Sequence, residues 1–454
     1  LRNHEKLELP LGAIENMKDF LRDNRQTFVD YAMRDTEVCL LALGYFINWC
    51  GRQSLSYRGF RAGITLGGTS VNLYKAFEGG SEALDILTGM EKRQIRTESG
   101  RCIWVKEPCD ARVIHDPLAA RCYHGGLNVA YTIGKVETPP DHAVYDIDLS
   151  GAYAGAMACL LSPSFKVSRA THVNEILEAV EVGQHVVARV KFQFPSDCEH
   201  PCLPISTKNG LIYVRKGESF CTGHEIITAV GLGAQIDIVD ADIWHVTDRR
   251  LFARYIGFTV GERSRYAKKT LENLLFKEMT NSLYGKVAQG IKDRKISNFS
   301  APEDGPRQLE PSAVTLPIIA AQITGIIRSA LFELNALWRA EGVRIVATTT
   351  DGSLVVAPVD YEFNAVATRS EAASRLQAGR DAAGITGDLL ELKATGSSLE
   401  SYRTRANLIF DHDGECIAKA GASMKFETHN RNDIAAEMRR IAALDKIETR
   451  ESTQ

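Results

Sequence analysis

The sequence predicts a mixed α+β protein of enzyme size, and three observations carry this expectation. The chain has 454 residues, of which 44% are hydrophobic and 24% charged, a normal balance for two or three packed modules. Segments with the period-two alternation of strands and segments with helical spacing of apolar residues both recur along the chain. The chain has no internal repeat and no low-complexity stretch. This composition excludes a disordered tail, a collagen-like repeat and a small disulfide scaffold.

Charge and cysteine content narrow the class of protein. Lys and Arg number 54 and Asp and Glu 57, a formal net charge of −3, so a nucleic-acid surface must be a local patch. The ten cysteines are irregularly spaced, and Cys198 and Cys202 lack a second pair for zinc, so we expect reduced thiols. The longest mostly apolar run, Val38 to Cys50, is shorter than the roughly 20 residues of a membrane helix. With no signal peptide at the start, we expect an intracellular (cytoplasmic) protein that does not contact a membrane.

The first 140 residues predict one helix followed by strands and turns. Residues 53–140 are rich in Gly, Thr and short β-prone runs, which indicates little helix. Before them, five large apolar or aromatic residues recur at helical spacing. These are Phe28, Tyr31, Val38, Leu41 and Tyr45.

Two alternating strands follow, over residues 142–149 and 186–194. In the first, Tyr145, Ile147 and Leu149 fall on one face. The opposite face carries Val144, Asp146 and Asp148.

The second half of the chain is mainly helical, with one clear β-hairpin. Residues 250–289 predict a helical hairpin broken near Gly257 to Gly261, and residues 317–340 a long helix with Pro at its first turn. Residues 343–356 predict a β-hairpin whose turn is Asp351-Gly352. From residue 389 onward, short strands precede an amphipathic helix over 432–447.

Two strand-borne carboxylates, Asp148 and Asp351, are the first candidates for chemistry. A carboxylate at a rigid hairpin tip can hold a hard cation, although Asp-Gly is also the commonest two-residue turn. Two acids on one strand face need partners or ions if they are buried, whereas a solvated strand face needs neither. Side by side, the two carboxylates would suit two Mg²⁺ ions about 4 Å apart, which perform in-line phosphoryl transfer.

A helical face in the predicted hairpin adds a possible phosphate and base contact. Lys277, Asn281, Tyr284 and Gly285 are spaced by four and then three or four residues, so one face carries them. A lysine there can grip a triphosphate, an aromatic ring can pack on a base, and a glycine allows close approach. A solvated amphipathic helix with Tyr packed inward is the alternative.

These residues resemble motifs of family B DNA polymerases. Lys277-x-x-x-Asn281-Ser-x-Tyr284-Gly285 resembles the fingers motif K-x-x-x-N-S-x-Y-G. The palm motifs D-x-x-S-L-Y-P and D-T-D-S are similar to two further segments, Asp148-Leu-Ser-Gly-Ala-Tyr153 and Thr349-Thr-Asp351-Gly352.

Two more segments continue the resemblance upstream. Tyr123-His-Gly125-Gly126 is similar to the Y-x-G-G segment that joins the exonuclease and polymerase domains. Tyr31-Ala-Met-Arg-Asp35 is similar to the Y-x-x-x-D motif that ends the exonuclease domain. All five motifs occur in the family's order and cover most of the chain.

The resemblance implies an α+β right-hand polymerase with an antiparallel palm sheet, a helical-hairpin fingers domain, a small thumb and a remnant of a 3'-5' exonuclease domain. The implied boundaries are 1–60 for the exonuclease remnant, 61–141 for a linker with the start of the polymerase domain, 142–249 for palm with an insertion, 250–300 for fingers, 301–400 for palm and 401–454 for thumb. The long interval between Asp148 and Lys277 resembles the insertion found in the protein-primed polymerases of phages and linear plasmids. The chain is therefore similar to that branch of the family, or to a related mobile-element branch.

The resemblance also implies roles for individual residues in DNA-templated addition of deoxyribonucleotides to a 3'-hydroxyl. Asp148, Asp351 and the carbonyl of Leu149 would hold two Mg²⁺ ions, with Mn²⁺ as a substitute, and Lys277 would neutralise the triphosphate. Tyr153 would stack under the incoming sugar and exclude a 2'-hydroxyl. The implied nucleotide-binding residues are Leu149, Ser150, Gly151, Ala152, Tyr153, Arg263, Arg265, Lys277, Asn281 and Tyr284. The implied DNA-binding residues are Tyr123, Gly125, Gly126, Gly285, Lys286 and Arg405.

The resemblance has departures as well. Thr349 replaces the first Asp of D-T-D-S, while the second, the direct ligand, is retained as Asp351. Gly151 and Ala152 replace Ser-Leu, which thins the wall facing the triphosphate. Tyr31 and Asp35 would be vestiges, because the other exonuclease acids either precede Leu1 or are missing from a degenerate domain. We therefore expect an N-terminally truncated chain that does not proofread.

The implied partners are template and primer DNA, dNTPs and, in the protein-primed branch, a terminal protein. Between residues 262 and 295, nine basic residues face four acidic ones, which fits a phosphate surface and equally fits a solvated helix.

Two alternatives for the function stay open: a catalytically weak or silent DNA-binding remnant, and a polymerase that uses RNA or ribonucleotides.

Overall fold

A computed structural model describes the chain as two compact units, residues 1–81 and 82–454. The described residues are 17–56, 60–63, 65–78, 88–108, 116–208, 210–268, 270–292, 294–297, 305–404 and 406–420, with a few single residues outside these ranges. Each unit is described by itself.

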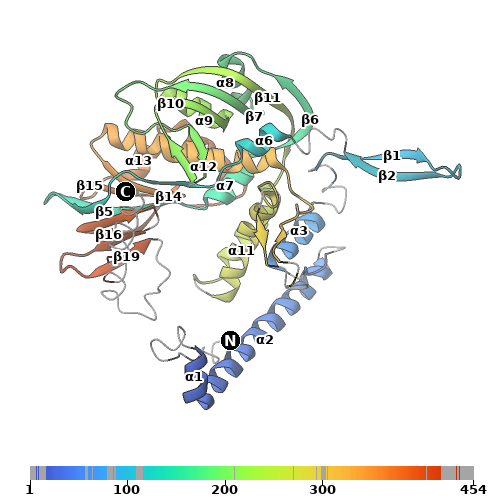
Figure 1. Cartoon of the computed structure of the whole chain (residues 1–454), viewed down its shortest axis with the longest axis horizontal. Coiled ribbons are helices and arrows are strands. Elements are labelled where there is room, and N and C mark those ends of the chain that lie inside the picture. The colour runs from blue at the N-terminus through green and yellow to red at the C-terminus, as the bar shows by residue number, and fades with distance from the viewer. Residues whose placement is uncertain are drawn as a thin grey trace. The chain divides into compact units, whose positions relative to one another are not determined.

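The secondary-structure elements described in the first unit are helices (Figure 1). Its helices are α1 (Met17–Asp23), α2 (Arg25–Ser56) and α3 (Leu66–Phe77). Helix α2 confirms the predicted helix and extends it at both ends. Helix α3 shows that the expectation of little helix between residues 53 and 140 was wrong there. Thr65 caps it by accepting a hydrogen bond from Gly68 N at 3.1 Å, and α3 buries Leu73 and Tyr74.

The second unit is built around a five-stranded antiparallel sheet with the order β16-β5-β15-β14-β3, here called the central sheet. Its strands are β3 (Leu127–Ala130), β5 (His142–Leu149), β14 (Arg344–Thr350), β15 (Gly352–Pro358) and β16 (Leu390–Gly396). Both the predicted strand over 142–149 and the predicted hairpin over 343–356 are present. Strands far apart in the sequence thus lie side by side, and β5 pairs directly with β15.

Helix α12 (Pro317–Ala340) has the predicted bounds and is the core helix of this unit. It contacts α7 (Ala152–Cys159), α9 (Gly223–Gly231) and α14 (Glu371–Ala382), and α13 (Phe363–Ala367) follows β15. By length and composition α12 could cross a membrane. It is therefore a longer apolar segment than residues 38–50, which were expected to be the longest. However, 94% of its most apolar window is buried inside the protein, which is typical of a core helix.

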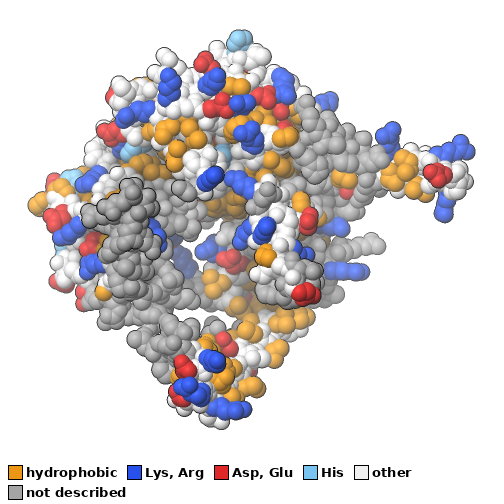
Figure 2. All heavy atoms as spheres, in the orientation of Figure 1, with side chains coloured by type: hydrophobic (Ala, Val, Ile, Leu, Met, Phe, Trp, Pro, Cys, Tyr) orange, Lys and Arg blue, Asp and Glu red, His pale blue; other side chains and the backbone are white. Residues whose placement is uncertain are grey.

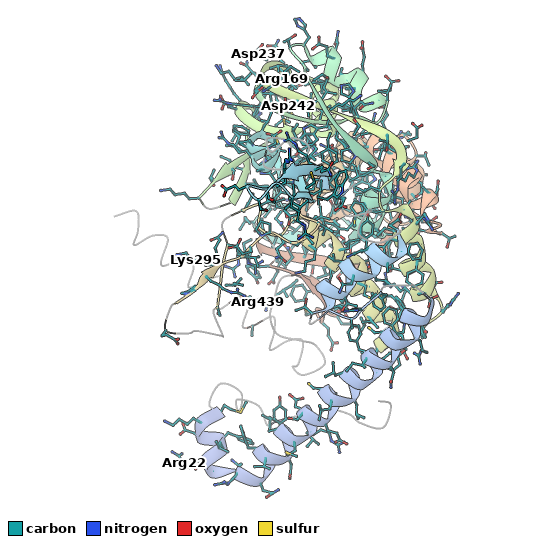
Figure 3. All side chains as sticks on the ribbon, turned by 90° about the vertical axis from the view of Figure 1, so that its right-hand side faces the viewer. Arg22, Arg169, Asp237, Asp242, Lys295 and Arg439 are labelled. Atoms are coloured by element: carbon teal, nitrogen blue, oxygen red, sulfur yellow. The ribbon has the colours of Figure 1, made fainter. Side chains whose placement is uncertain are left out.

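An outer antiparallel sheet has the order β10-β7-β11-β6. Its elements are β6 (Leu161–Arg169), β7 (His185–Gln193), β10 (Lys216–Thr222) and β11 (Gln235–Arg250), with α8 (Val173–Glu181) and α9 against it. Strand β7 confirms the predicted strand over 186–194. Across β6 and β11, Arg169 Nε pairs with Asp242 Oδ1 at 3.1 Å (Figure 3).

The helical hairpin consists of α10 (Ala253–Ser264) and α11 (Leu271–Val287). The predicted break at Gly257 to Gly261 is wrong, because both glycines lie inside α10. A side chain at Gly257 would stand 3.0 Å from the carbonyl oxygen of Ala383, so close packing requires this glycine. The break lies after Ser264, and Thr270 caps α11 by accepting from Asn273 N.

The C-terminal sheet has the order β19-β18-β17-β4 and shares a hydrophobic cluster with the central sheet. Its strands are β4 (Gly134–Glu137), β17 (Ser398–Arg403), β18 (Ala406–Phe410) and β19 (Cys416–Ala420). The cluster contains Val136, Val144, Val346, Ala347, Leu354, Val356, Leu399 and Ile409. The face of β5 that carries Val144, Asp146 and Asp148 is therefore covered at its Val144 end. The helix predicted over 432–447 lies outside the continuously described residues.

The remaining elements are short. They are β1 (Met90–Arg96), β2 (Cys102–Pro108), α6 (Pro117–Cys122), β8 (Pro204–Thr207), β9 (Gly210–Tyr213), β12 (Lys295–Ile296) and β13 (Arg307–Gln308). Strands β1 and β2 form a two-stranded ribbon that stands apart from the other sheets and carries Arg side chains toward its far end (Figures 1 and 2).

Candidate active site

Pairing of β5 with β15 brings Asp148 and Asp351 together. Gly352 lies directly opposite Asp148 in the register, and Leu149 N donates a hydrogen bond of 2.8 Å to the carbonyl oxygen of Asp351. The Asp148 side chain stays about one third exposed, at 32%. Asp148 and Asp351 therefore lie next to each other, as predicted, and are here called the carboxylate pair.

Position 352 needs a glycine because neighbouring atoms leave no room for a side chain, and not because of the turn conformation. A Cβ at this position would lie inside contact distance of Asp148 Oδ1 and 2.8 Å from the carbonyl oxygen of Ile147. Gly352 pairs with Thr349, so the two-residue turn is Thr350-Asp351 and the predicted Asp351-Gly352 turn is wrong by one residue. Thr350 takes the left-handed conformation there, with φ of 61°, which is strained for a β-branched residue.

Gly126 packs on the back of this turn. A Cβ on Gly126 would stand 3.0 Å from Thr350 Cα, whereas a Cβ on Gly125 would meet nothing within 4 Å. Of the two glycines of Tyr123-His-Gly125-Gly126, one thus seats the carboxylate-bearing hairpin. This contact explains why the segment needs glycine at Gly126.

Burial and the charges of neighbouring carboxylates raise the pKa of three carboxyl groups at the exposed end of β5. Burial raises the pKa of Asp351 to about 6, with the charge of Asp148 as the next cause. Burial and Asp148 likewise raise the pKa of Asp146 to about 6. Burial also raises the pKa of Asp148, which Lys393 and Lys277 oppose. Crowded, desolvated carboxylates of this kind are typical of functional sites.

Lys393 and Glu391 on β16 complete the charged surroundings, and the sequence motifs did not identify them. Lys393 Nζ lies 3.9 Å from Asp148 Oδ2 and 2.7 Å from Glu391 Oε2. Glu391 also pairs with Lys268 of the helical hairpin at 3.3 Å. Asp146 was visible from strand alternation, but no pattern indicated that β16 would be the other neighbour of β5.

Helix α11 presents its predicted face. Lys277, Asn281 and Gly285 are exposed and Tyr284 is half-buried, while Phe276 and Leu283 pack inward. Lys277 is close enough to lower the pKa of both Asp148 and Asp351. The lysine of the helix and the carboxylate pair of the central sheet therefore belong to one site.

Three tyrosines connect this helix to two predicted motifs. The rings of Tyr153 and Tyr284 have centroids 4.7 Å apart, and the hydroxyls of Tyr123 and Tyr284 are 3.2 Å apart. Burial raises the pKa of Tyr284, as does the nearby Tyr123 hydroxyl. Lys292 lies over the Tyr123 ring at 5.6 Å.

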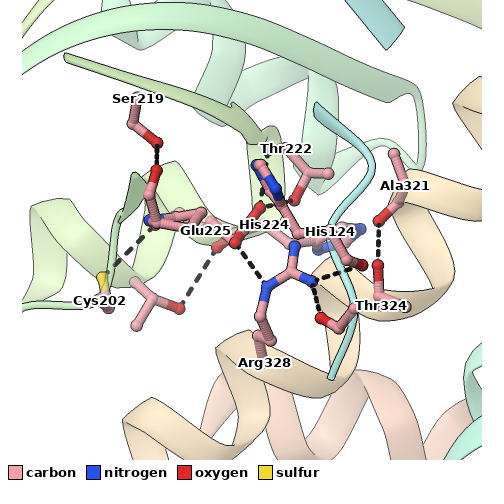
Figure 4. Close-up of polar contacts among 12 residues, drawn as sticks. His124, Cys202, Ser219, Thr222, His224, Glu225, Ala321, Thr324 and Arg328 are labelled. Atoms are coloured by element: carbon pink, nitrogen blue, oxygen red, sulfur yellow. Dashed lines mark hydrogen bonds and ion pairs between the residues drawn. The ribbon is translucent and has the colours of Figure 1, made fainter. Parts of the chain in front are cut away.

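Arg328 of α12 anchors the segment that precedes β3 (Figure 4). Its Nε donates to Glu225 at 2.9 Å, and its Nη1 donates to the carbonyl oxygens of His124 and Gly125 at 3.1 and 2.6 Å. Arg328 and Glu225 are both fully buried. Burial of His124, together with the Arg328 charge, lowers the His124 pKa to about 4. The sequence pattern did not identify this ion pair, because one Arg in an apolar helix has no local signature.

The other predicted residues have varied surroundings. Ser150 N donates to the carbonyl oxygen of Leu389, and Gly151 has φ of 63° where β5 turns into α7. Arg263 donates to Asn273, Arg265 pairs with Glu262, and Lys286 donates to Gln289. Ala152 is buried at the start of α7. Arg405 lies outside the described residues, and Tyr31 and Asp35 lie on α2 in the other unit.

The donor set fits Mg²⁺ but not a protein-only metal cage. Among the described residues, no group of three or more His, Cys, Asp or Glu is placed to hold a metal ion. Mg²⁺ prefers oxygen ligands and commonly uses one or two carboxylates completed by water and substrate phosphates. Asp148, Asp351 and the backbone around Leu149 supply such oxygens, and the absence of a side chain at Gly352 lets the Asp148 carboxylate lie against β15.

Gly352→Ala is expected to lower the free energy of unfolding by about 1–3 kcal/mol, because the new methyl group meets the backbone of β5. Chemical denaturation followed by circular dichroism measures this cost. Gly261→Ala is the matched control, since its Cβ would meet nothing within 4 Å. Equal stability of the two variants would contradict the spatial role of Gly352.

Comparison with known proteins agrees with this geometry. The family described as DNA polymerase type B, organellar and viral, matches residues 120–313. The chain is 30% identical over 441 residues to the Escherichia coli protein "Primer-independent DNA polymerase PolB". This similarity covers 92% of the chain and 49% of the relative, so the chain spans about half the length of that protein.

Solved structures share the fold at low sequence identity. An orthorhombic crystal form of Phi29 DNA polymerase has a TM-score of 0.57 at 13% identity, covering 88% of this chain and 66% of that one. The ternary complex of Phi29 DNA polymerase with primer-template DNA and incoming nucleotide has a TM-score of 0.52 at 14% identity, covering 81% and 61%. The match to the type B DNA polymerase family covers residues 120–313, which include Asp148 and Lys277, and the chain shares its fold with Phi29 DNA polymerase.

Proposed function

We propose that the chain is a DNA-templated DNA polymerase that adds deoxyribonucleotides to a 3'-hydroxyl by phosphoryl transfer. The observation that carries this proposal is the carboxylate pair on two neighbouring strands, with Lys277 close enough to act on both carboxylates. Phosphoryl transfer depends on positioning and on neutralising charge, and this arrangement supplies both.

In this proposal the central sheet is the palm and the helical hairpin is the fingers domain. A thumb follows about residue 402, and α2, with Tyr31 and Asp35, belongs to a remnant of an exonuclease domain. The palm strands hold the reacting groups rigidly, because each carboxylate is fixed by backbone pairing at the end of its strand. Helix α11 would then present Lys277, Asn281 and Tyr284 to the substrate.

Asp148, Asp351 and the carbonyl of Leu149 would hold two Mg²⁺ ions. When bound, such ions lower the pKa of the attacking hydroxyl and neutralise the leaving phosphate. Lys277 would pair with the triphosphate of the incoming nucleotide, with Arg263 and Arg265 as further phosphate contacts. Tyr153 and Asn281 would line the sugar and base positions.

The proposed partners are DNA strands and dNTPs. Tyr123, Gly126, Gly285 and Lys286 would contact template or primer, because they border the tyrosine cluster and the turn that carries Asp351. Phi29 DNA polymerase has been solved with primer-template DNA and nucleotide, and the Escherichia coli relative is named primer-independent. We propose that this chain replicates a phage, plasmid or other mobile element and starts on a primer, on a terminal protein or without either.

Extension of a labelled primer on a defined template, with Mg²⁺ and four dNTPs, tests the proposal. The expected result is template-directed incorporation by the full chain, and parallel reactions with Mn²⁺ or without primer report ion preference and priming. Ribonucleotides and an RNA template test the alternative substrates. No incorporation in any reaction would overturn the proposal and leave a non-catalytic remnant.

That remnant is the second candidate, and Thr349 favours it. Thr349 occupies the position of a family carboxylate, and its hydroxyl oxygen is buried without a hydrogen-bond partner among the described residues. A protein of this kind would bind primer-template DNA in a gel-shift experiment and yet incorporate nothing.

Tyr153→Val is expected to admit ribonucleotides, because it removes the ring that packs against Tyr284 and would block a 2'-hydroxyl. Single-nucleotide incorporation gives kcat/KM for a dNTP and for the matching NTP. The ratio of the dNTP value to the NTP value should fall at least about tenfold, which is a loss of about 1.4 kcal/mol in discrimination between the two substrates. Tyr361→Phe, whose ring packs on Phe363 away from this cluster, serves as the control. An unchanged ratio would remove Tyr153 from sugar selection.

A further inference from the structure

Lys393 lies at an irregularity in the pairing of β16 with β5, close to Asp148. Along β16 and β5, Glu391 pairs with Asp148, Leu392 with Ile147 and Ala394 with Asp146. Lys393 is therefore the extra residue of a β-bulge. Bulges re-aim side chains and occur preferentially next to active sites.

The register around this bulge places two like charges opposite each other. Glu391 and Asp148 are direct cross-strand partners, an arrangement that destabilises a sheet unless a counter-charge intervenes. Lys393 Nζ supplies that charge, at 2.7 Å from Glu391 and 3.9 Å from Asp148. The shorter distance shows that Glu391 holds the ammonium group more closely than Asp148 does.

We propose that Lys393 is a positioning residue that acts as the built-in counter-ion of Asp148, and that Glu391 limits this action by holding the same ammonium group. The inference rests on the proposed function, in which Asp148 is a cation ligand. A divalent ion that binds the carboxylate pair then competes with Lys393 for Asp148. Glu391 favours the ion by drawing the ammonium group away.

The proposal predicts changes of opposite sign for the two partners. Lys393→Met removes the competing charge and should strengthen binding of a divalent ion about three- to tenfold, because both side chains are partly exposed and the interaction is screened. Glu391→Gln leaves the ammonium group to Asp148 and should weaken binding by a similar factor. A merely structural pair would move both affinities in the same direction.

The experiment titrates the 454-residue chain, free of DNA and nucleotide, with Mn²⁺ at about pH 8, where the carboxyl groups are ionised. Unbound Mn²⁺ is followed by electron paramagnetic resonance. Asp351→Asn should abolish the binding. Lys135→Met and Glu137→Gln are the matched controls, since this exposed pair on β4 also joins residues two apart at 2.8 Å. Both controls should leave the affinity unchanged, and thermal melts verify folding.

The double variant Lys393→Met/Glu391→Gln separates the two possible actions of Glu391. If Glu391 acts through Lys393, the double variant binds Mn²⁺ as tightly as Lys393→Met alone. A penalty from Glu391→Gln that persists without Lys393 would overturn the proposal, since Glu391 would then act on the ion directly.

The remaining outcomes distinguish this inference from the proposed function. Unchanged or weaker Mn²⁺ binding by folded Lys393→Met overturns the inference alone. A parent protein that binds no Mn²⁺ overturns the cation assignment of the carboxylate pair and this inference with it. Primer extension is measured separately, so loss of activity with retained Mn²⁺ binding counts only against the proposed reaction.

Discussion

Asp351→Asn is expected to reduce primer extension roughly a thousandfold and to leave the fold at least as stable as the parent. The activity is expected to fall because the site would lose one of the two carboxylates that we propose as Mg²⁺ ligands, while the neutral amide keeps the shape of the turn. Primer extension with Mg²⁺ measures the loss.

The stability expectation follows from the raised pKa of Asp351, which burial and Asp148 lift from 3.8 to about 6. Between these values the folded protein keeps a proton that the unfolded chain releases, so stability falls as the pH rises. The destabilising effect of the ionised group is complete above about pH 6 and absent well below 3.8. Asparagine removes this effect, so without divalent ions the variant should unfold at an equal or higher temperature than the parent at pH 7.

Asp237→Asn is the control, because Asp237 is exposed on β11 of the outer sheet (Figure 3). It should change neither activity nor unfolding temperature. Rapid extension by Asp351→Asn would contradict the cation assignment. A lower unfolding temperature would contradict the repulsion between Asp351 and Asp148.

Local patterns predicted most of the elements that position the site. Alternation identified β5 and β7, and the proline at its first turn placed the start of α12 at Pro317. These signals are local, so one sequence suffices to see them. The errors at Gly257 and Gly352 share a physical cause. Both glycines were interpreted as breaks or turns, whereas each is required because a distant backbone or side chain approaches closely.

The parts of the site that were missed depend on long-range pairing. Asp148 and Asp351 were identified because each belongs to a recognisable motif. Lys393 and Glu391 gain their meaning only from the register of β16 on β5. Arg328 gains its meaning from Glu225, about a hundred residues away, and from two backbone carbonyls. Strand order and buried ion pairs are properties of the folded chain that no single segment encodes.

Arg328→Met is expected to have the largest effect on stability, lowering the free energy of unfolding by about 3–5 kcal/mol, as is usual when one partner of a buried ion pair is removed. Glu225 is 1% exposed and, among the described residues, would keep Thr222 N and Oγ1, at 2.9 and 3.0 Å, as donors. Urea denaturation measures the cost. Arg339→Met, which breaks a more exposed pair with Glu199, should lose at most about 1 kcal/mol.

A second substitution separates the stability of this ion pair from its role in positioning. Arg328→Met/Glu225→Gln neutralises the stranded carboxylate and should recover much of the lost stability, because an uncharged buried pair avoids the desolvation cost. It does not restore the hydrogen bonds to the carbonyl oxygens of His124 and Gly125, which precede the glycine that seats Thr350. We therefore expect a stable double variant in which primer extension stays impaired. Recovery of activity together with stability would mean that Arg328 only balances the charge of Glu225, and that Gly126 and the turn carrying Asp351 hold their places without it.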